Sequence, residues 1–343
     1  MAGLSLGEIE QARRQPHHTA LLFLTDRCPV GCAHCSVDSR PGTPRLDLDL
    51  LGRLLDGLCS VPDLAFVGVS GGEPFVERRG LTMAVDRLTN AGRQVVLYTS
   101  GVWAHRDPPP AWVGGVLRRA AHVVLSTDGY HAARLPASRF VAAARAVLAA
   151  GTRLSVQVVD QPGAHAAAHE MLGRALGPTW VDQVEVKVVP LLPYGRAAGQ
   201  PGLATSHRPG AWFGRCEVAT SPVVRHDGRI VGCCNEQVLT GHGPAVLRRS
   251  ATTADQTVAV FAQLRANPHL RSVSQIGLGP LTRLAGLTDL ATREFTDPCG
   301  LCWAIAERGA VSPGAGGVHD RLDSLLRAHD ALQTDRSQAG ARP

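Results

Sequence analysis

Apolar, strand-like runs alternate with helical segments from about residue 20 to residue 190, and this alternation constrains the fold more than any other feature. One strand-plus-helix unit takes about 30 residues, which is the spacing that parallel strands joined by helices require. The strand-like runs are Ala20–Thr25, Leu64–Val69, Gln94–Thr99, His122–Ser126, Leu154–Val159 and Val184–Pro190, and the helical segments are Leu48–Cys59, Glu77–Ala91, Trp112–Ala120, Ser138–Ala150 and Ala164–Leu176. Because six units are too few to close an eight-stranded barrel, we expect an α/β fold with a partial (βα)6 TIM-like barrel.

The composition changes after residue 190, where a Pro- and Gly-rich stretch predicts a connecting loop. Further on, Val223–Arg225 and Arg229–Val231 flank an Asp-Gly turn and predict a hairpin. An amphipathic helix is expected over His319–Leu332, followed by a disordered tail. We therefore predict an N-terminal extension (1–19), a barrel (20–200), a small cysteine-rich α+β extension (201–312), and a C-terminal helix with a disordered tail (313–343).

Charge and hydropathy exclude several classes of protein. The net charge of +6 comes from 35 basic and 29 acidic residues scattered along the chain, and aromatic residues make up 4%, which argues against a nucleic-acid partner. There is no apolar run long enough for a membrane span and no secretory signal, so we expect a cytoplasmic protein without a membrane partner. In that compartment the nine cysteines stay reduced, and clustered thiols then indicate metal binding or catalysis.

Three cysteines, Cys28, Cys32 and Cys35, follow the first predicted strand directly. In parallel barrels, reactive groups lie on the loops after the strands. Three soft ligands suit an iron–sulfur cube or zinc, and they leave one metal position open. A structural zinc site would need a fourth ligand, and His34 is awkwardly placed for that because it adjoins Cys35.

The second predicted strand runs into Ser70-Gly71-Gly72-Glu73-Pro74. Glycines at a strand end allow the backbone to approach a ligand closely, and Glu73 offers a carboxylate to an ammonium group. Taken alone, the same residues could form a simple turn.

The cysteine spacing and this turn, in this order, resemble the radical S-adenosylmethionine (SAM) superfamily over about residues 20–200. The resemblance implies that Cys28, Cys32 and Cys35 hold a 4Fe–4S cluster whose open iron is chelated by SAM. It also implies that His34 lies near the adenine and that Gly71, Gly72, Glu73 and Pro74 form the turn that binds the SAM amino group.

Later strand ends match the family more loosely. Ser126 and Asp128 resemble its Ser-x-Asp turn and are candidate SAM contacts. Arg134 or Arg139 could pair with the SAM carboxylate through a planar guanidinium. The segment Pro193–Ala197 resembles one found after the sixth strand in relatives with additional clusters.

A second cysteine group lies between residues 216 and 302 and contains five cysteines. Four ligands would satisfy a closed metal site, either an iron–sulfur cluster or zinc. Cys233 and Cys234 are adjacent and point to opposite sides of an extended chain, so we expect one of them, Cys233, to ligate. The predicted ligands are Cys216, Cys233, Cys299 and Cys302. The pattern resembles the SPASM and shorter twitch extensions of radical SAM enzymes, and five cysteines limit it to one auxiliary 4Fe–4S cluster.

The resemblance implies a radical SAM oxidoreductase or maturase that generates a 5′-deoxyadenosyl radical and abstracts hydrogen from its substrate. We expect a natural-product tailoring oxidation or crosslink, with ribosomal peptide maturation slightly ahead of dehydrogenation of an aminocyclitol or sugar. A reductase such as flavodoxin or ferredoxin is implied. With 27 residues before Cys28, leader-peptide recognition would need a separate protein. The alternatives from another class are a zinc-binding interaction module and an iron–sulfur electron carrier.

Overall fold

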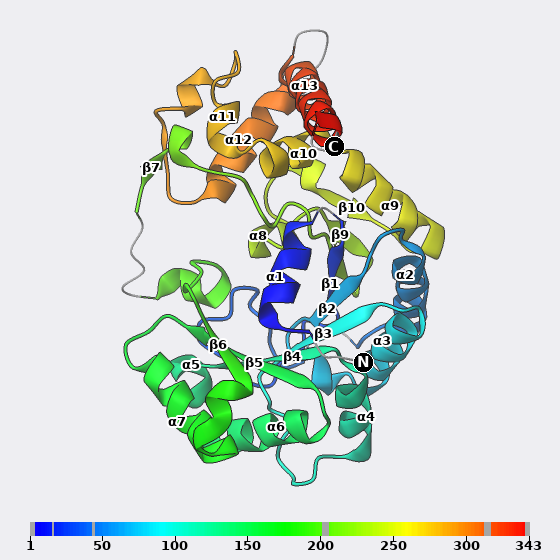
Figure 1. Ribbon diagram of the computed structural model, residues 1–343, viewed down its shortest axis with the longest axis vertical. Coiled ribbons are helices and arrows are strands. Elements are labelled where there is room, and N and C mark those ends of the chain that lie inside the picture. The colour runs from blue at the N-terminus through cyan, green and yellow to red at the C-terminus, as the bar shows by residue number, and fades with distance from the viewer. Residues whose placement is uncertain (1–3, 16, 43–44, 201–205, 312–316, 340–343) are drawn as a thin grey trace.

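The computed structural model describes residues 4–15, 17–42, 45–200, 206–311 and 317–339, and its core is one nine-stranded sheet in the order β10-β9-β8-β1-β2-β3-β4-β5-β6 (Figure 1). The first six strands pair in parallel. They are β1 (Thr19–Phe23), β2 (Phe66–Ser70), β3 (Gln94–Thr99), β4 (His122–Thr127), β5 (Arg153–Val159) and β6 (Val184–Val189). Six parallel strands joined by helices confirm the predicted α/β class.

The connecting helices cover the outer face of these strands and begin and end within two residues of the predicted bounds (Figure 1). They are α2 (Leu48–Ser60), α3 (Arg78–Asn90), α4 (Ala111–Arg119), α6 (Ala137–Ala149) and α7 (Ala164–Leu176). In α2, the Asp47 carboxylate accepts hydrogen bonds from the first-turn amides, and Leu51, Leu54, Leu55 and Leu58 form a fully buried stripe. Capping and 3.6-residue periodicity thus act together.

Helix α1 (Leu6–Arg14) lies on the inner side of the barrel, where the sequence predicted only an extension. Leu4 and Ile9 pack against Val96 and Val124 from the strands. The Leu4 carbonyl oxygen lies 2.7 Å from Nδ1 of His122, the first residue of β4. Since these contacts lie toward the amino ends of the strands, α1 forms the floor of the barrel interior.

The C-terminal part continues the barrel sheet. Strand β8 (Val223–Arg225) pairs in parallel with β1 and forms the predicted hairpin with β9 (Arg229–Val231), and β10 (Arg248–Ser250) pairs with β9. The hydrogen-bonded sheet therefore crosses the predicted boundary at residue 200, and the division into domains stays a prediction.

The other elements either connect the barrel strands or make up the C-terminal part of the chain (Figure 1). They are α5 (Gly129–Ala132), β7 (Arg208–Pro209), α8 (Glu236–Leu239), α9 (Ala254–Ala266), α10 (Pro268–Gln275), α11 (Leu278–Leu281), β11 (Glu294–Phe295), α12 (Pro298–Val311) and α13 (Val318–Ala339), with short 3-10 turns at Pro74–Val76, Pro178–Asp182, Gly195–Gly199, Gly210–Trp212, Ala245–Leu247 and Thr288–Leu290. The tail predicted to be disordered is helical as far as Ala339, because no proline or glycine interrupts α13, and residues 340–343 lie outside the described residues. Among the described helices, none combines the length and apolar character that crossing a bilayer demands.

Candidate active site

A cavity of about 280 Å³ opens at the carboxyl edge of the parallel strands. All three cysteines of the first cluster line it. The strand ends contribute Ser70 from β2, Thr99 from β3, Ser126 from β4, Val159 from β5 and Val189 from β6. The structure therefore brings the cysteine loop and five strand ends to one site, as the position of the cysteines after β1 predicted.

The segment Pro193–Ala197 packs against the cysteine loop. The Arg196 guanidinium donates hydrogen bonds to the carbonyl oxygens of Cys32 (2.9 Å) and Ser39 (2.8 Å). The backbone N–H of Arg196 donates to the carbonyl oxygen of Cys35. A Cβ on Gly195 would lie 2.4 Å from the Cys35 carbonyl oxygen, so this contact requires glycine. The resemblance of this segment to a family motif thus corresponds to a physical role in fixing the loop.

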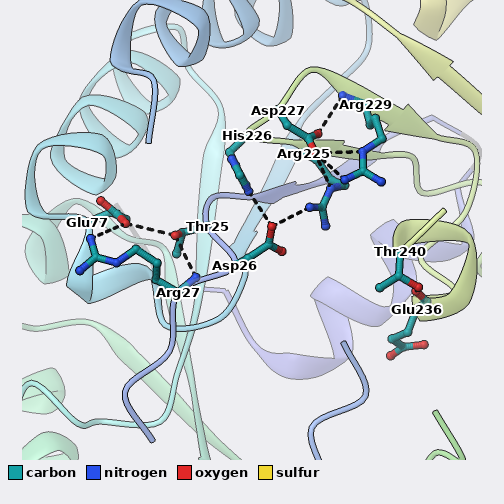
Figure 2. A network of polar contacts seen from close by, with 10 residues as sticks. All are labelled: Thr25, Asp26, Arg27, Glu77, Arg225, His226, Asp227, Arg229, Glu236 and Thr240. Carbon is teal, nitrogen blue, oxygen red and sulfur yellow. Dashed lines mark hydrogen bonds and ion pairs between the residues drawn. The ribbon is translucent and has the colours of Figure 1, made fainter. Parts of the chain in front are cut away.

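Figure 2 shows how the β8–β9 hairpin fixes the residues just before Cys28. Arg225 is 3% exposed, and its guanidinium donates to the carboxylates of Asp26 (2.8 Å) and Asp227 (3.3 Å). His226 Nε2 lies 3.0 Å from the same Asp26 oxygen. The chain entering the cysteine loop is therefore held by residues about 200 positions later in the sequence.

The Gly71-Gly72 turn packs against the same loop from the other side. A Cβ on Gly71 would lie 2.6 Å from the Thr25 carbonyl oxygen, and one on Gly72 would lie 2.3 Å from that of Arg27. The missing side chains of these glycines thus allow the turn to lie directly against the backbone of the cysteine loop. Pro74 is buried at the start of the 3-10 turn that follows.

Glu73 is buried and engaged within the protein. Its carboxylate accepts hydrogen bonds from Thr99 Oγ1 (2.8 Å), Ser100 N (2.9 Å) and Ser100 Oγ (2.6 Å). Burial raises the pKa of Glu73, and the donated hydrogen bonds oppose that shift. Ser100, rather than Glu73, lines the cavity, so the carboxylate reaches the site through Ser100.

His34 and Asp128 come together with His131, a residue that sequence reasoning missed. Asp128 is 5% exposed and accepts from His131 Nδ1 (2.9 Å), while His34 Nε2 lies 3.6 Å away. Burial lowers the pKa of His34 to about 4. Burial also opposes protonation of His131, but its hydrogen bonds to Asp128 and Cys32 prevail and raise its pKa to about 10. Asp128 caps α5, and that N-cap pattern was the available signal that His131 turns back toward it.

The two arginine candidates lie apart from the cavity wall. Arg134 is exposed beyond α5, and Arg139 donates to the Val102 carbonyl oxygen at 2.7 Å. Neither is among the described residues that line the cavity. A contact between Arg134 and SAM stays a prediction without a geometric counterpart.

Four C-terminal thiols lie in one neighbourhood of the structure. Burial raises the pKa of Cys302, and the neighbouring Cys233, Cys216 and Cys299 raise it further. Asn235 Nδ2 donates to Cys299 Sγ at 3.3 Å, and His269 Nε2 lies 3.1 Å from Cys302 Sγ.

Cys234 faces the other way, with its Sγ 3.8 Å from the Arg13 guanidinium. The structure therefore groups Cys233, not Cys234, with the other three thiols. Their role as metal ligands stays a prediction.

The spacing of the thiol groups favours an iron–sulfur cluster over a single zinc ion. A tetrahedral zinc ion places thiolate sulfurs about 3.8 Å apart. Among the described residues, the sulfurs of the three loop cysteines do not all lie within 4.8 Å of one another. The same holds for any three of the four C-terminal cysteines. Buried polar atoms without a described partner, His34 Nδ1 and Ser39 Oγ, belong to residues in the cavity wall. These features suit an iron–sulfur cube beside a polar ligand.

A second cavity of about 200 Å³ lies between α1 and the inner face of the sheet. It shares Ser70, Tyr98 and Glu236 with the first cavity, so the two adjoin. Its wall is mostly apolar, with Arg13 and Glu236 as its charged residues. Burial raises the pKa of Glu236.

No family model matches the chain. The chain is 36% identical over 114 residues to the PqqA peptide cyclase of Rhodopseudomonas palustris, which covers 33% of this chain and 29% of that relative. The match thus spans less than a third of the relative's length.

Among solved structures, the fold is similar to native anSMEcpe with bound AdoMet and Cp18Cys peptide (TM-score 0.51, 12% identity, 78% of this chain and 86% of that one). A BtrN complex with AdoMet and 2-DOIA also matches (TM-score 0.41, 14% identity, 81% of this chain and 92% of that one). The curated match confirms the resemblance to radical SAM enzymes, and the first structural match confirms the partial-barrel fold.

Proposed function

We propose that the chain is a radical SAM enzyme whose Cys28, Cys32 and Cys35 hold a 4Fe–4S cluster. One observation carries this proposal: all three thiols line a single cavity at the carboxyl edge of the parallel strands. When bound, such a cluster supplies the electron that cleaves SAM to methionine and a 5′-deoxyadenosyl radical. The protein's own part is to bind SAM, orient the substrate and exclude side reactions.

Polar groups of the cavity wall would receive SAM. The Ser70, Ser100 and Ser126 hydroxyls line the wall, and Glu73 fixes the position of Ser100. The His34 ring is stacked on Tyr130 with centroids 4.6 Å apart, which supports the predicted place for the adenine beside His34. Burial raises the pKa of Cys28 to about 11, so its thiol must lose a proton when metal binds.

The substrate we propose is a ribosomal peptide undergoing oxidation or crosslinking. The curated relative is named for cyclising a peptide, and the second cavity adjoins the first. An apolar cavity of about 150 Å³ accommodates a benzene ring, so about 200 Å³ suits one peptide side chain. In this proposal Arg13 and Glu236 contact the polar groups of that residue.

The C-terminal thiols would hold one auxiliary 4Fe–4S cluster, with Cys216, Cys233, Cys299 and Cys302 as ligands. Such a centre can accept an electron from a substrate radical. A flavodoxin- or ferredoxin-type reductase would supply the first electron, and a separate protein would present the leader peptide. Reduced thiols and these partners point to the cytoplasm as the place of action.

The test is the metal content and SAM cleavage of anaerobically reconstituted protein. We expect about eight irons per chain and, with dithionite and SAM, formation of 5′-deoxyadenosine. Cys28→Ala, Cys32→Ala and Cys35→Ala should each abolish SAM cleavage. Full cleavage in any of these variants, or iron without cleavage in the wild type, would overturn the proposal.

Cys59→Ala is the matched control. Its thiol lies in α2, where its hydrogen-bonding contact is the Arg87 carbonyl oxygen at 3.6 Å. This variant should retain both iron content and SAM cleavage. Loss of cleavage in the control as well would mean that thiol substitution acts through folding.

A further inference from the structure

The cysteine loop carries a second set of converging metal-ligating atoms. One ligand atom from each of Cys32, His34 and His131 lies within 4.8 Å of the other two. Cys32 and His34 come from the loop after β1, and His131 comes from α5 after β4. All three line the first cavity. This set shares only Cys32 with the three-thiol set.

Asp128 orients both imidazole rings. Its carboxylate is bound to His131 Nδ1 at 2.9 Å, so Nε2 is the nitrogen that makes the ring's hydrogen bond to Cys32, and a metal ion would replace that bond. The same oxygen lies 3.6 Å from His34 Nε2, and His34 Nδ1 is buried without a partner among the described residues. A carboxylate that engages one nitrogen of each ring is the arrangement that supports metal-bound histidines in proteins.

We propose that Cys32, His34 and His131 form a mononuclear site for a divalent ion of the zinc class. Tetrahedral zinc places sulfur and nitrogen ligands about 3.3 to 3.6 Å apart, so atoms within 4.8 Å need to close by at most about 1.5 Å. Two imidazoles and one thiolate are ordinary zinc ligands, and the cavity leaves a fourth position open to water.

This ion and the 4Fe–4S cluster exclude each other, because both require the Cys32 thiolate. That exclusion, unlike the ion site itself, rests on the proposed function. The cysteine loop then has two metal states, and the zinc state cannot bind the cluster that cleaves SAM. Metal supply would decide which state forms.

The first experiment counts ions bound to the full-length apo chain, with zinc and with cobalt as a spectroscopic probe. Cys32→Ala and His131→Ala should each lose one ion relative to the wild type, whereas Cys28→Ala and Cys35→Ala should keep it. The cobalt difference spectrum between wild type and His131→Ala should show charge transfer from a single thiolate. His105→Ala, at an exposed histidine between β3 and α4, should change nothing.

Asp128→Asn gives a variant that keeps all three ligands. As a positioning residue, Asp128 should affect affinity rather than stoichiometry, with zinc bound about 10- to 100-fold more weakly. Equal loss of the ion in Cys28→Ala and Cys35→Ala would show that three thiols hold it, and would overturn the proposed set. Unchanged zinc binding in His131→Ala would do the same.

The second experiment reconstitutes the cluster after zinc loading. Zinc should lower the iron incorporated into the wild type by one cluster and leave incorporation into His131→Ala unaffected. Equal incorporation in zinc-loaded and zinc-free wild type would overturn the exclusion. If the wild type takes up iron and still forms no 5′-deoxyadenosine, the proposed function fails while the zinc count stands on its own.

Discussion

Glu73→Gln separates an internal role of this carboxylate from direct contact with SAM. Oxygen Oε1 accepts from Phe75 N (3.2 Å) and Thr99 Oγ1 (2.8 Å), while Oε2 accepts from the Ser100 N–H and hydroxyl. An amide replaces one oxygen with an NH₂ group, which donates. In either orientation of the amide, its NH₂ group faces the backbone N–H of Phe75 or of Ser100, and two donors then meet without an acceptor.

The Thr99 hydroxyl cannot rotate to accept a hydrogen bond from the new NH₂ group. Its hydroxyl oxygen already accepts from Gly101 N and Trp103 Nε1, both at 3.1 Å, so its proton is committed to Glu73. A buried donor left without an acceptor costs about 1–3 kcal/mol, and hydrogen bonds to a charged group contribute about 1.5–3 kcal/mol each. Removing a buried charge offsets part of this. We expect a net loss of about 2 kcal/mol, or about 3 °C in Tm.

The assay is thermal and urea unfolding of the apo-protein without SAM, where a ligand contact has no effect. Glu170→Gln is the control, since its side chain is 64% exposed and pairs with Arg174 in the next helical turn. That change should stay within about 0.5 kcal/mol. If Glu73→Gln apo-protein unfolded like the wild type while SAM affinity fell, the internal role would be refuted.

Three further predictions follow from the same geometry. Gly72→Ala places a Cβ 2.3 Å from the Arg27 carbonyl oxygen and should cost about 2 kcal/mol or more and lower iron retention, whereas Gly115→Ala, with nothing within 4 Å, should not destabilise. Burial opposes ionisation of Asp227, but Arg229 and Arg225 prevail and lower its pKa to about 2. The ionised carboxylate therefore stabilises the fold above pH 3.8, and this stabilisation is lost as pH falls through about 2. In urea unfolding, Asp227→Asn should be less stable than the wild type at about pH 6 and approach it at about pH 2. Cys299→Ala should still cleave SAM but form little product, and equal product in both proteins would contradict an auxiliary role.

The sequence predicted the barrel well because its signals are local. Strand β3 and helix α7 begin and end at the predicted residues, since β3 is an apolar run between polar residues and α7 is a helical segment between Gly163 and Gly177. The Asp-Gly turn likewise placed β8 and β9 correctly. Periodicity and turn chemistry act within a few residues, so a single sequence is enough to read them.

Helix α1 was missed although a local signal was available. Ser5 and Glu8 form a capping box in which each side chain binds the other residue's backbone N–H. Nine residues are too few for a strong periodic pattern, and the partners of α1 lie on distant strands. A nine-residue helix gains its stability from that packing, which the sequence alone does not display.

The candidate site was predicted as a set of residues but not as a geometry, because the cysteine loop takes its shape from distant partners. Arg225 holds Asp26 before Cys28, the Gly71-Gly72 turn packs on Arg27, and Arg196 binds the carbonyl oxygen of Cys32.

Each of these anchors comes from a different part of the chain, and in its described residues the loop forms one β-bridge, between Arg27 and Arg40, and no helix. A buried backbone polar group is destabilising unless it is hydrogen-bonded. Loss of one anchor would therefore leave a carbonyl or carboxylate oxygen of the loop without its hydrogen bond and lower stability. The metal binding proposed for three thiols within eight residues would for this reason depend on the whole fold, including the hairpin that lies beyond residue 200.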